Sequence, residues 1–164
     1  MGTAGPAEYL NGLPGNAARA ALTRCCPSRR WVDAMLAARP FGSDAALFKA
    51  AERAWWALGK DDWLEAFGGH PRIGERAVDA LAQREQAGMR RAGEETRTAL
   101  AQGNHEYEAR FGHVFLICAT GQSATDMLGA LRARLGNDPT TELRVAAGEQ
   151  AKITRLRLEK LAAS

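Results

Sequence analysis

The sequence predicts an all-α protein. Almost every segment carries apolar residues three and four positions apart, with Ser, Asp, Gly or Pro where helices begin and end. Only one run is rich in β-forming residues, and a single strand cannot build a sheet. We therefore expect a compact single-domain bundle of about seven to nine helices over residues 1–164.

The composition is typical of an ordinary globular domain. The chain has 164 residues, enough to bury a sizeable core without disulfides or metals. Hydrophobic residues make up 46% and charged residues 25%. The net charge is +3, and the basic residues are scattered rather than grouped, so we expect no nucleic-acid partner.

Hydropathy predicts neither a membrane span nor a targeting signal. No apolar run approaches the roughly 18 residues that a span needs, so we expect no membrane association. The first residues lack the basic-then-apolar pattern of a secretory signal, and the last three are not the peroxisomal tripeptide. The expected location is the cytoplasm.

Cysteine and histidine spacing predicts neither disulfides nor a metal site. The three cysteines are an odd number, and two of them, Cys25 and Cys26, are adjacent. The three histidines are far apart, and no Cys/His spacing matches a zinc site. We therefore expect a protein that holds no metal.

The first 70 residues predict four helices after a loose lead-in. Residues 1–15 are rich in glycine and proline, so we expect little there beyond a short turn at 8–10. Apolar spacing predicts the helices, with Ser28 as one N-cap and Ser43 or Asp44 as another. Their expected bounds are 16–24, 28–39, 44–58 and 61–67.

The remaining residues predict four more helices. The last is the best defined, because Asp138 can cap it and Pro139 suits the first helical position. Ser123 is the expected cap of the helix before it. Earlier in the chain, His105 and its neighbour Asn104 are expected on the solvated side of their helix. The expected bounds are 75–86, 93–110, 123–135 and 139–161.

The β-forming run, residues 114–119, lies between Gly112 and Gly121. It is either an extended segment that crosses the core or a turn of buried helix, because periodicity alone does not decide. If it is extended, its N–H and C=O groups need partners, and a polar ligand could supply them.

The most distinctive local feature is the stretch 67–75, FGGHPRIGE. Gly68 and Gly69 are expected to end the preceding helix through the left-handed conformation that glycine adopts. Pro71 keeps His70 out of the helical region, so His70 is expected on a rigid loop where its imidazole can exchange protons. The alternative interpretation is a surface histidine in a tight turn.

Glu85 falls in the middle of the apolar face of the 75–86 helix, with Val78, Leu81 and Ala82. Burying a lone carboxylate is costly, so such a residue is paired, protonated or functional. The alternative is that the helix ends before Glu85 and the side chain reaches water.

Arg157 shares the inward face of the last helix with Leu143, Gln150 and Ile153, whereas Arg155 points away. Arginine is rarely buried without a partner, and its planar fork suits a carboxylate or a carbonyl–amide edge. The alternative is an Arg–Glu pair that only joins two helices.

Several of these stretches together resemble the OHCU decarboxylase family. Its members convert 2-oxo-4-hydroxy-4-carboxy-5-ureidoimidazoline (OHCU) to allantoin at the end of urate breakdown. The match runs from about residue 7 to 161. The stretches that match the family pattern most specifically are Trp63–Phe67 with His70–Gly74, Ala82–Gln86, Arg110–Ala119 and Ile153–Leu158. Nearer the N-terminus, Cys26–Ser28, Trp31 and Arg39–Phe41 also fit it.

The resemblance implies an all-helical homodimer without a metal or organic cofactor. It implies that His70 is the catalytic histidine and that Glu85 acts beside it. Ala82 stands where the family commonly has serine, so one hydroxyl contact is missing there. The substrate-binding residues that it implies are Pro71, Ala82, Glu85, Gln86, Phe115, Leu116, Ile117, Cys118, Ala119 and Arg157, with the 115–119 segment acting largely through its backbone.

The implied reaction, OHCU to (S)-allantoin, is chemically reasonable without a cofactor. The carboxylate-bearing carbon lies beside a C=N bond that can accept the electrons left when CO₂ departs. Two alternatives remain: a non-enzymatic helical interaction module, and a decarboxylase of a related cyclic ureide. An enzyme requires His70, Glu85 and Arg157 around one pocket, whereas an interaction module does not.

Overall fold

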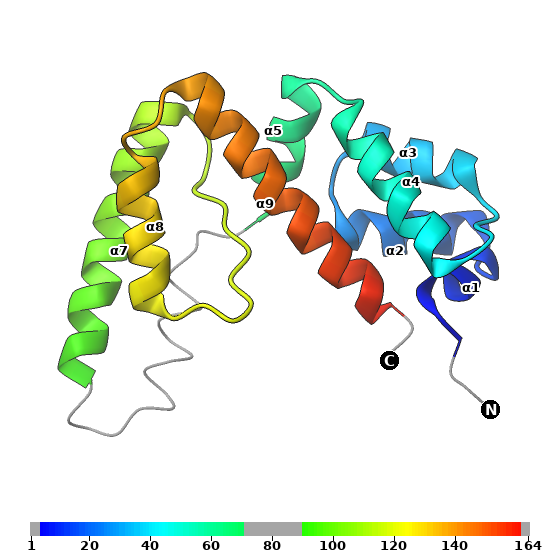
Figure 1. The fold of residues 1–164 in the computed structure, drawn as a ribbon, viewed down its shortest axis with the longest axis horizontal. Coiled ribbons are helices and arrows are strands. Elements are labelled where there is room, and N and C mark those ends of the chain that lie inside the picture. The colour runs from blue at the N-terminus through cyan, green and yellow to red at the C-terminus, as the bar shows by residue number, and fades with distance from the viewer. Residues whose placement is uncertain (1–3, 71–89, 162–164) are drawn as a thin grey trace. The chain divides into compact units, whose positions relative to one another are not determined.

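The computed structural model describes residues 4–70 and 90–161. In these ranges the chain forms eight α-helices and no strand, so the all-α prediction is confirmed (Figure 1). The predicted helix at 75–86 lies outside the described residues. The helices are α1 (Pro6–Asn11), α2 (Gly15–Cys25), α3 (Arg29–Ala38), α4 (Asp44–Trp56), α5 (Lys60–Gly68), α7 (Arg90–Phe111), α8 (Ala124–Arg134) and α9 (Pro139–Lys160).

The chain divides into two compact units. The first unit comprises residues 1–69 and 150–164, and the second comprises residues 70–149. The expectation of a single domain stays a prediction. No helix in the described ranges is both long and apolar enough to cross a bilayer.

The first unit is organised around α3, which packs against α2, α4 and α5. Local sequence explains where its helices start. The Ser28 Oγ accepts the Trp31 N–H at 3.4 Å, and the Ser43 Oγ accepts the Ala46 N–H at 3.0 Å, as the capping prediction requires. The largest side chains in its core are fully buried: Leu10, Leu22, Trp31, Met35, Leu47 and Phe67.

The lead-in is not loose, because α1 occupies most of it and packs on α4. The Ala7 N–H donates to Asp44 Oδ1 at 3.0 Å. The Asn11 side chain pairs with the Phe41 backbone in both directions, each bond 2.8 Å long. The prediction of a short turn was therefore wrong, because the groups that fix α1 lie some thirty residues away in sequence.

The second unit is built on α7 and α8, which pack against each other. A Cβ on Gly103 of α7 would lie 2.5 Å from Leu131 Cδ2 of α8, so glycine permits this close approach. Asn104 is buried rather than solvated, whereas His105 is exposed as predicted. The shared core consists of Leu100, Tyr107, Phe115, Ile117, Ala124, Met127, Leu128 and Leu131.

Helix starts in this part of the chain also follow local chemistry. Ser123 and Asp126 form a reciprocal capping box at α8, with bonds of 3.0 and 3.1 Å. Asp138 Oδ1 accepts the Thr141 N–H at 2.9 Å, and Pro139 opens α9. Both starts were predicted from the sequence.

The hydrogen bonds between Asn11 and the Phe41 backbone give a prediction about stability. Asn11→Ala removes both bonds to Phe41, and we expect the free energy of unfolding to fall by about 1–2 kcal/mol. Asn16→Ala is the matched control, because Asn16 is exposed and its side chain accepts from the neighbouring Ala17 N–H rather than from a distant segment; it should stay within about 0.5 kcal/mol of wild type. Urea denaturation measures both, and equal values for the two variants would mean that α1 contributes nothing.

Candidate active site

The residues predicted for the site fall into separate parts of the structure. His70 and the 115–119 segment belong to the second unit, and Arg157 belongs to the first. Their convergence on one pocket therefore stays a prediction. The predicted contacts that lie outside the described residues are Pro71, Ala82, Glu85 and Gln86.

His70 follows directly after the end of α5 and is half-buried. The helix ends where the sequence predicted, but for a different reason. Gly69 has a right-handed φ of −80°, so left-handed backbone is not what glycine supplies here. A Cβ on Gly69 would lie 2.4 Å from Pro27 Cγ. Glycine is needed because the chain before His70 passes directly over Pro27.

The 114–119 run is neither helix nor strand. The glycines that bracket it, Gly112 and Gly121, have φ angles of +81° and +79°, a region that favours glycine. These two turns account for the way in which the chain leaves α7 and later enters α8. Within the run, Phe115, Leu116 and Ile117 are buried, whereas Cys118 and Ala119 are half-buried.

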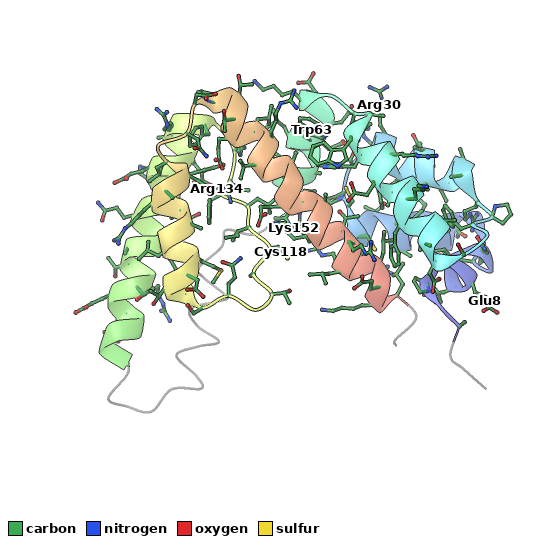
Figure 2. The ribbon with its side chains drawn as sticks, viewed as in Figure 1. Glu8, Arg30, Trp63, Cys118, Arg134 and Lys152 are labelled. Carbon is green, nitrogen blue, oxygen red and sulfur yellow. The ribbon has the colours of Figure 1, made fainter. Side chains whose placement is uncertain are left out.

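The His113 ring lies with Nδ1 3.1 Å from the Val114 carbonyl, and three further side chains hold the rest of the backbone of this run. Arg134 Nη1 donates to the Leu116 carbonyl at 2.8 Å. Glu149 Oε1 accepts the Cys118 N–H at 3.0 Å, and Gln122 Nε2 donates to the Cys118 carbonyl at 2.9 Å. Figure 2 labels Arg134 and Cys118.

Ile117 lies between these fixed points and is only 4% exposed. Neither its N–H nor its C=O has a hydrogen-bond partner among residues 4–70 and 90–161. Buried backbone groups are almost always paired, so this peptide donor and acceptor are suited to a polar ligand.

The arginine that holds Leu116 is itself held by a fully buried carboxylate. Glu142 accepts from Tyr107 Oη at 2.7 Å, Arg134 Nε at 2.6 Å and Asn137 Nδ2 at 3.0 Å. The Arg134 guanidinium also lies 4.5 Å from the centroid of the Phe115 ring. The two buried charges therefore face each other, and neutral donors and acceptors add hydrogen bonds to the pair, while Arg134 Nη2 makes none among the described residues.

Tyr107 remains a donor in this network. Burial raises the pKa of its hydroxyl, and the hydrogen bond to the Glu142 carboxylate raises it further. The phenol therefore stays protonated near neutral pH.

Sequence reasoning missed the Arg134–Glu142 pair, although a signal was present. Arg134 lies seven residues after Met127 and three after Leu131, so it falls on the apolar face of α8. The same test identified Glu85 and Arg157.

Arg157 is half-buried, and its Nη1 donates to the Arg24 carbonyl at the end of α2 at 3.1 Å. A cation at a helix C-terminus is favourable, and this bond leaves other donors of the guanidinium for a ligand. Arg155 is exposed, as predicted: its Nε lies 3.0 Å from Glu159, and its guanidinium carbon lies 4.1 Å from the Phe48 ring centroid.

The two cysteines near Arg157 are not prepared for nucleophilic chemistry. Burial raises the pKa of Cys25 to about 11 and that of Cys26 to about 12, with Arg157 offsetting only part of the shift. Both are therefore neutral thiols near neutral pH. In the ranges that the structure covers, no three His, Cys, Asp or Glu side chains gather as a metal site would require.

Comparison with known proteins gives the family. The model of the OHCU decarboxylase family matches residues 11–159. The chain belongs to the OHCU decarboxylase family. It is 37% identical over 145 residues to a bifunctional uric acid degradation protein of Arabidopsis thaliana, covering 84% of this chain and 45% of the relative. It is 43% identical over 86 residues to a putative 2-oxo-4-hydroxy-4-carboxy-5-ureidoimidazoline decarboxylase of Homo sapiens, covering 51% and 50%. The chain spans about half the length of these curated relatives.

Two solved structures share this fold. A crystal structure of OHCU decarboxylase in the presence of (S)-allantoin matches with a TM-score of 0.74 at 35% identity, covering 87% of this chain and 96% of that one. A crystal structure of (S)-allantoin synthase matches with a TM-score of 0.71 over 94% of this chain and 53% of that one. At 20% identity the second match supports the fold alone.

The buried network gives a prediction about the tyrosines. Tyr107→Phe removes a hydrogen bond from a fully buried carboxylate, and we expect it to lower the free energy of unfolding by about 1–3 kcal/mol. The chain has one other tyrosine, Tyr9, which is half-buried on α1. Tyr9→Phe is the control and should change stability by less than about 0.5 kcal/mol. If chemical denaturation found Tyr107→Phe as stable as wild type, the network would not support the segment that it touches.

Proposed function

We propose that this protein decarboxylates OHCU to (S)-allantoin, without a metal or organic cofactor, as a cytoplasmic homodimer. The observation that carries the proposal is the buried Ile117 peptide. Its donor and acceptor lack partners among the described residues, in a chain that belongs to the OHCU decarboxylase family. A cyclic ureide presents N–H and C=O groups along its edge, the complement of a peptide N–H and C=O.

The reaction places three demands on the protein. The C–C bond to the carboxylate breaks and CO₂ leaves. The released electron pair forms a C=C bond to the ureido-bearing carbon, and the former C=N pair moves to the imine nitrogen, which takes up a proton. The resulting enol then takes a proton on the ureido-bearing carbon, while its hydroxyl proton is lost to give the carbonyl of allantoin. The site must bind the ring, favour loss of the carboxylate, and deliver the proton to one face only.

The proposed roles follow from the chemistry of each residue. His70 is the proton donor, because imidazole can carry a proton near neutral pH and its loop position presents it at a helix end. Glu85 orients the ureido or hydroxyl group. Gln86 and the 115–119 backbone bind the ring, and Pro71 and Ala82 line the site. Arg157 directs its planar fork to the ring or its substituents.

The direct test uses substrate made in place. Purified protein is added to OHCU freshly generated from urate by the two preceding enzymatic steps, and circular dichroism follows the chirality of the allantoin. The proposal predicts rapid formation of the (S) enantiomer, with exhaustive chelation leaving the rate unchanged. Racemic allantoin formed at the uncatalysed rate would refute it, and a panel of cyclic ureides would reveal a related substrate.

His70→Asn tests the proton donor. Asparagine keeps a polar side chain after Gly69 but cannot exchange protons, so we expect turnover to fall about 100-fold or more with the thermal melt nearly unchanged. His105→Asn is the matched control, because His105 is exposed on α7. Near wild-type turnover in the His70 variant would remove His70 from the chemistry, and an unfolded variant would mean that its role is structural.

Arg157→Lys and Arg155→Lys test which arginine of α9 binds the substrate. Lysine at 157 can still donate to the Arg24 carbonyl but lacks the planar guanidinium that can make two parallel hydrogen bonds to the substrate. We therefore expect kcat/KM to fall at least about 10-fold. Arg155 is half-exposed in its ion pair with Glu159, and its conservative replacement should be nearly silent. Steady-state kinetics with thermal melts decide between them. If Arg155→Lys lowered kcat/KM more than Arg157→Lys, the site would lie on the other face of the helix.

A further inference from the structure

The Ile117 peptide groups are useful to a ligand only if the backbone on either side is fixed. Leu116 on one side is held through its carbonyl by Arg134. Cys118 on the other side is held twice, through its N–H by Glu149 and through its carbonyl by Gln122. The run is not part of a β-sheet, so these side chains supply the backbone hydrogen bonds that a neighbouring strand would otherwise make.

We propose that Glu149 and Gln122 are positioning residues that form a clamp on Cys118 and so set the direction of the Ile117 C=O toward the substrate. This inference rests on the proposed function, because it assigns the clamp to the same ligand-binding segment. Neither side chain is required to touch the substrate. Each acts through the Cys118 peptide.

Glu149 is the stronger half of the clamp for a physical reason. Its bond to Cys118 has a carboxylate acceptor, and hydrogen bonds to charged groups contribute more than bonds between neutral groups. The Cys118 N–H belongs to the peptide unit that contains the Ile117 carbonyl. Because that unit is planar, fixing its N–H also fixes the direction of the Ile117 C=O.

Gln122 controls the other end of the same residue. The Gln122 N–H group itself donates to the Ala119 carbonyl at 3.0 Å, so its backbone forms a turn with the end of the run. Its side chain then reaches back to the Cys118 carbonyl at 2.9 Å. The turn at Gly121 makes this return possible, because its φ of +79° reverses the chain.

The clamp differs from the buried Glu142 network in how it should respond to mutation. Glu142 is fully buried, and removing it leaves charges and donors without partners. Glu149 is half-buried, so water can replace a lost side chain there. Loss of the clamp should therefore affect the order of the segment and the use of substrate more than global folding.

The test compares Glu149→Ala with Glu149→Gln. Alanine removes the acceptor for the Cys118 N–H, whereas the glutamine oxygen can still accept it. We expect kcat/KM for OHCU to fall about 10-fold in Glu149→Ala and less than about 3-fold in Glu149→Gln. Gln122→Ala is the second variant and should lower kcat/KM in the same direction. Glu159→Ala is the control: this exposed carboxylate lies on the same helix and, among the described residues, pairs with the exposed Arg155.

Hydrogen exchange gives a readout that does not depend on activity. In Glu149→Ala the peptide containing residues 115–119 should exchange faster than in wild type, while peptides from α7 and α8 remain unchanged. In Glu149→Gln and Glu159→Ala all peptides should match wild type. This pattern would separate a local clamp from a residue that merely supports the fold.

Three results would overturn the clamp. One is unchanged exchange and kcat/KM in Glu149→Ala. Another is equal damage in Glu149→Ala and Glu149→Gln, because the charge rather than the acceptor would then matter. The third is faster exchange throughout α7 and α8, which would mean general destabilisation. A wild-type protein that did not convert OHCU would instead refute the proposed function, and the exchange data alone would still decide whether Glu149 holds the Cys118 peptide.

Discussion

The buried pair of Glu142 and Arg134 is the interaction on which the second unit depends. Removing two charges from water is costly, and the cost is offset only when both are fully bonded. Here the carboxylate accepts from three side chains, and Arg134 Nη1 donates to the Leu116 carbonyl, whereas Arg134 Nη2 faces Glu142 in the ion pair without a hydrogen bond among the described residues. The pair therefore joins α8 and α9 to a run of chain that has no regular structure of its own.

In the proposed function, this connection lets a helical protein present peptide groups to a ligand. Helices use up their own N–H and C=O groups, so an all-α fold must leave some chain outside its helices to offer them. The 114–119 run does this between two glycine turns, with buried apolar side chains anchoring it in the core. Its backbone is then held by side chains on α8, on α9 and in the following turn, and the N–H and C=O of Ile117, between two held residues, lack partners among the described residues.

Sequence reasoning succeeded where the physics is local. The Ser28, Ser43 and Ser123 caps involve partners three residues away, and each was predicted correctly. It failed where distant groups decide the structure. The helix α1 is fixed by Asp44 and Phe41, and Arg157 meets a carbonyl 133 residues away. Arg134 could have been found from its apolar-face position, but its partner Glu142 depends on how α8 and α9 meet.

A titration of isoleucine-labelled protein with (S)-allantoin tests the central claim most directly. The chain has three isoleucines, Ile73, Ile117 and Ile153, so ¹⁵N-isoleucine labelling gives a simple amide spectrum. Ile153 lies within α9, where its amide is bonded inside the helix and serves as a reference. The account predicts a large, saturable shift of the Ile117 amide that is weaker with the (R) enantiomer. An Ile117 signal that stays still while allantoin binds would contradict it.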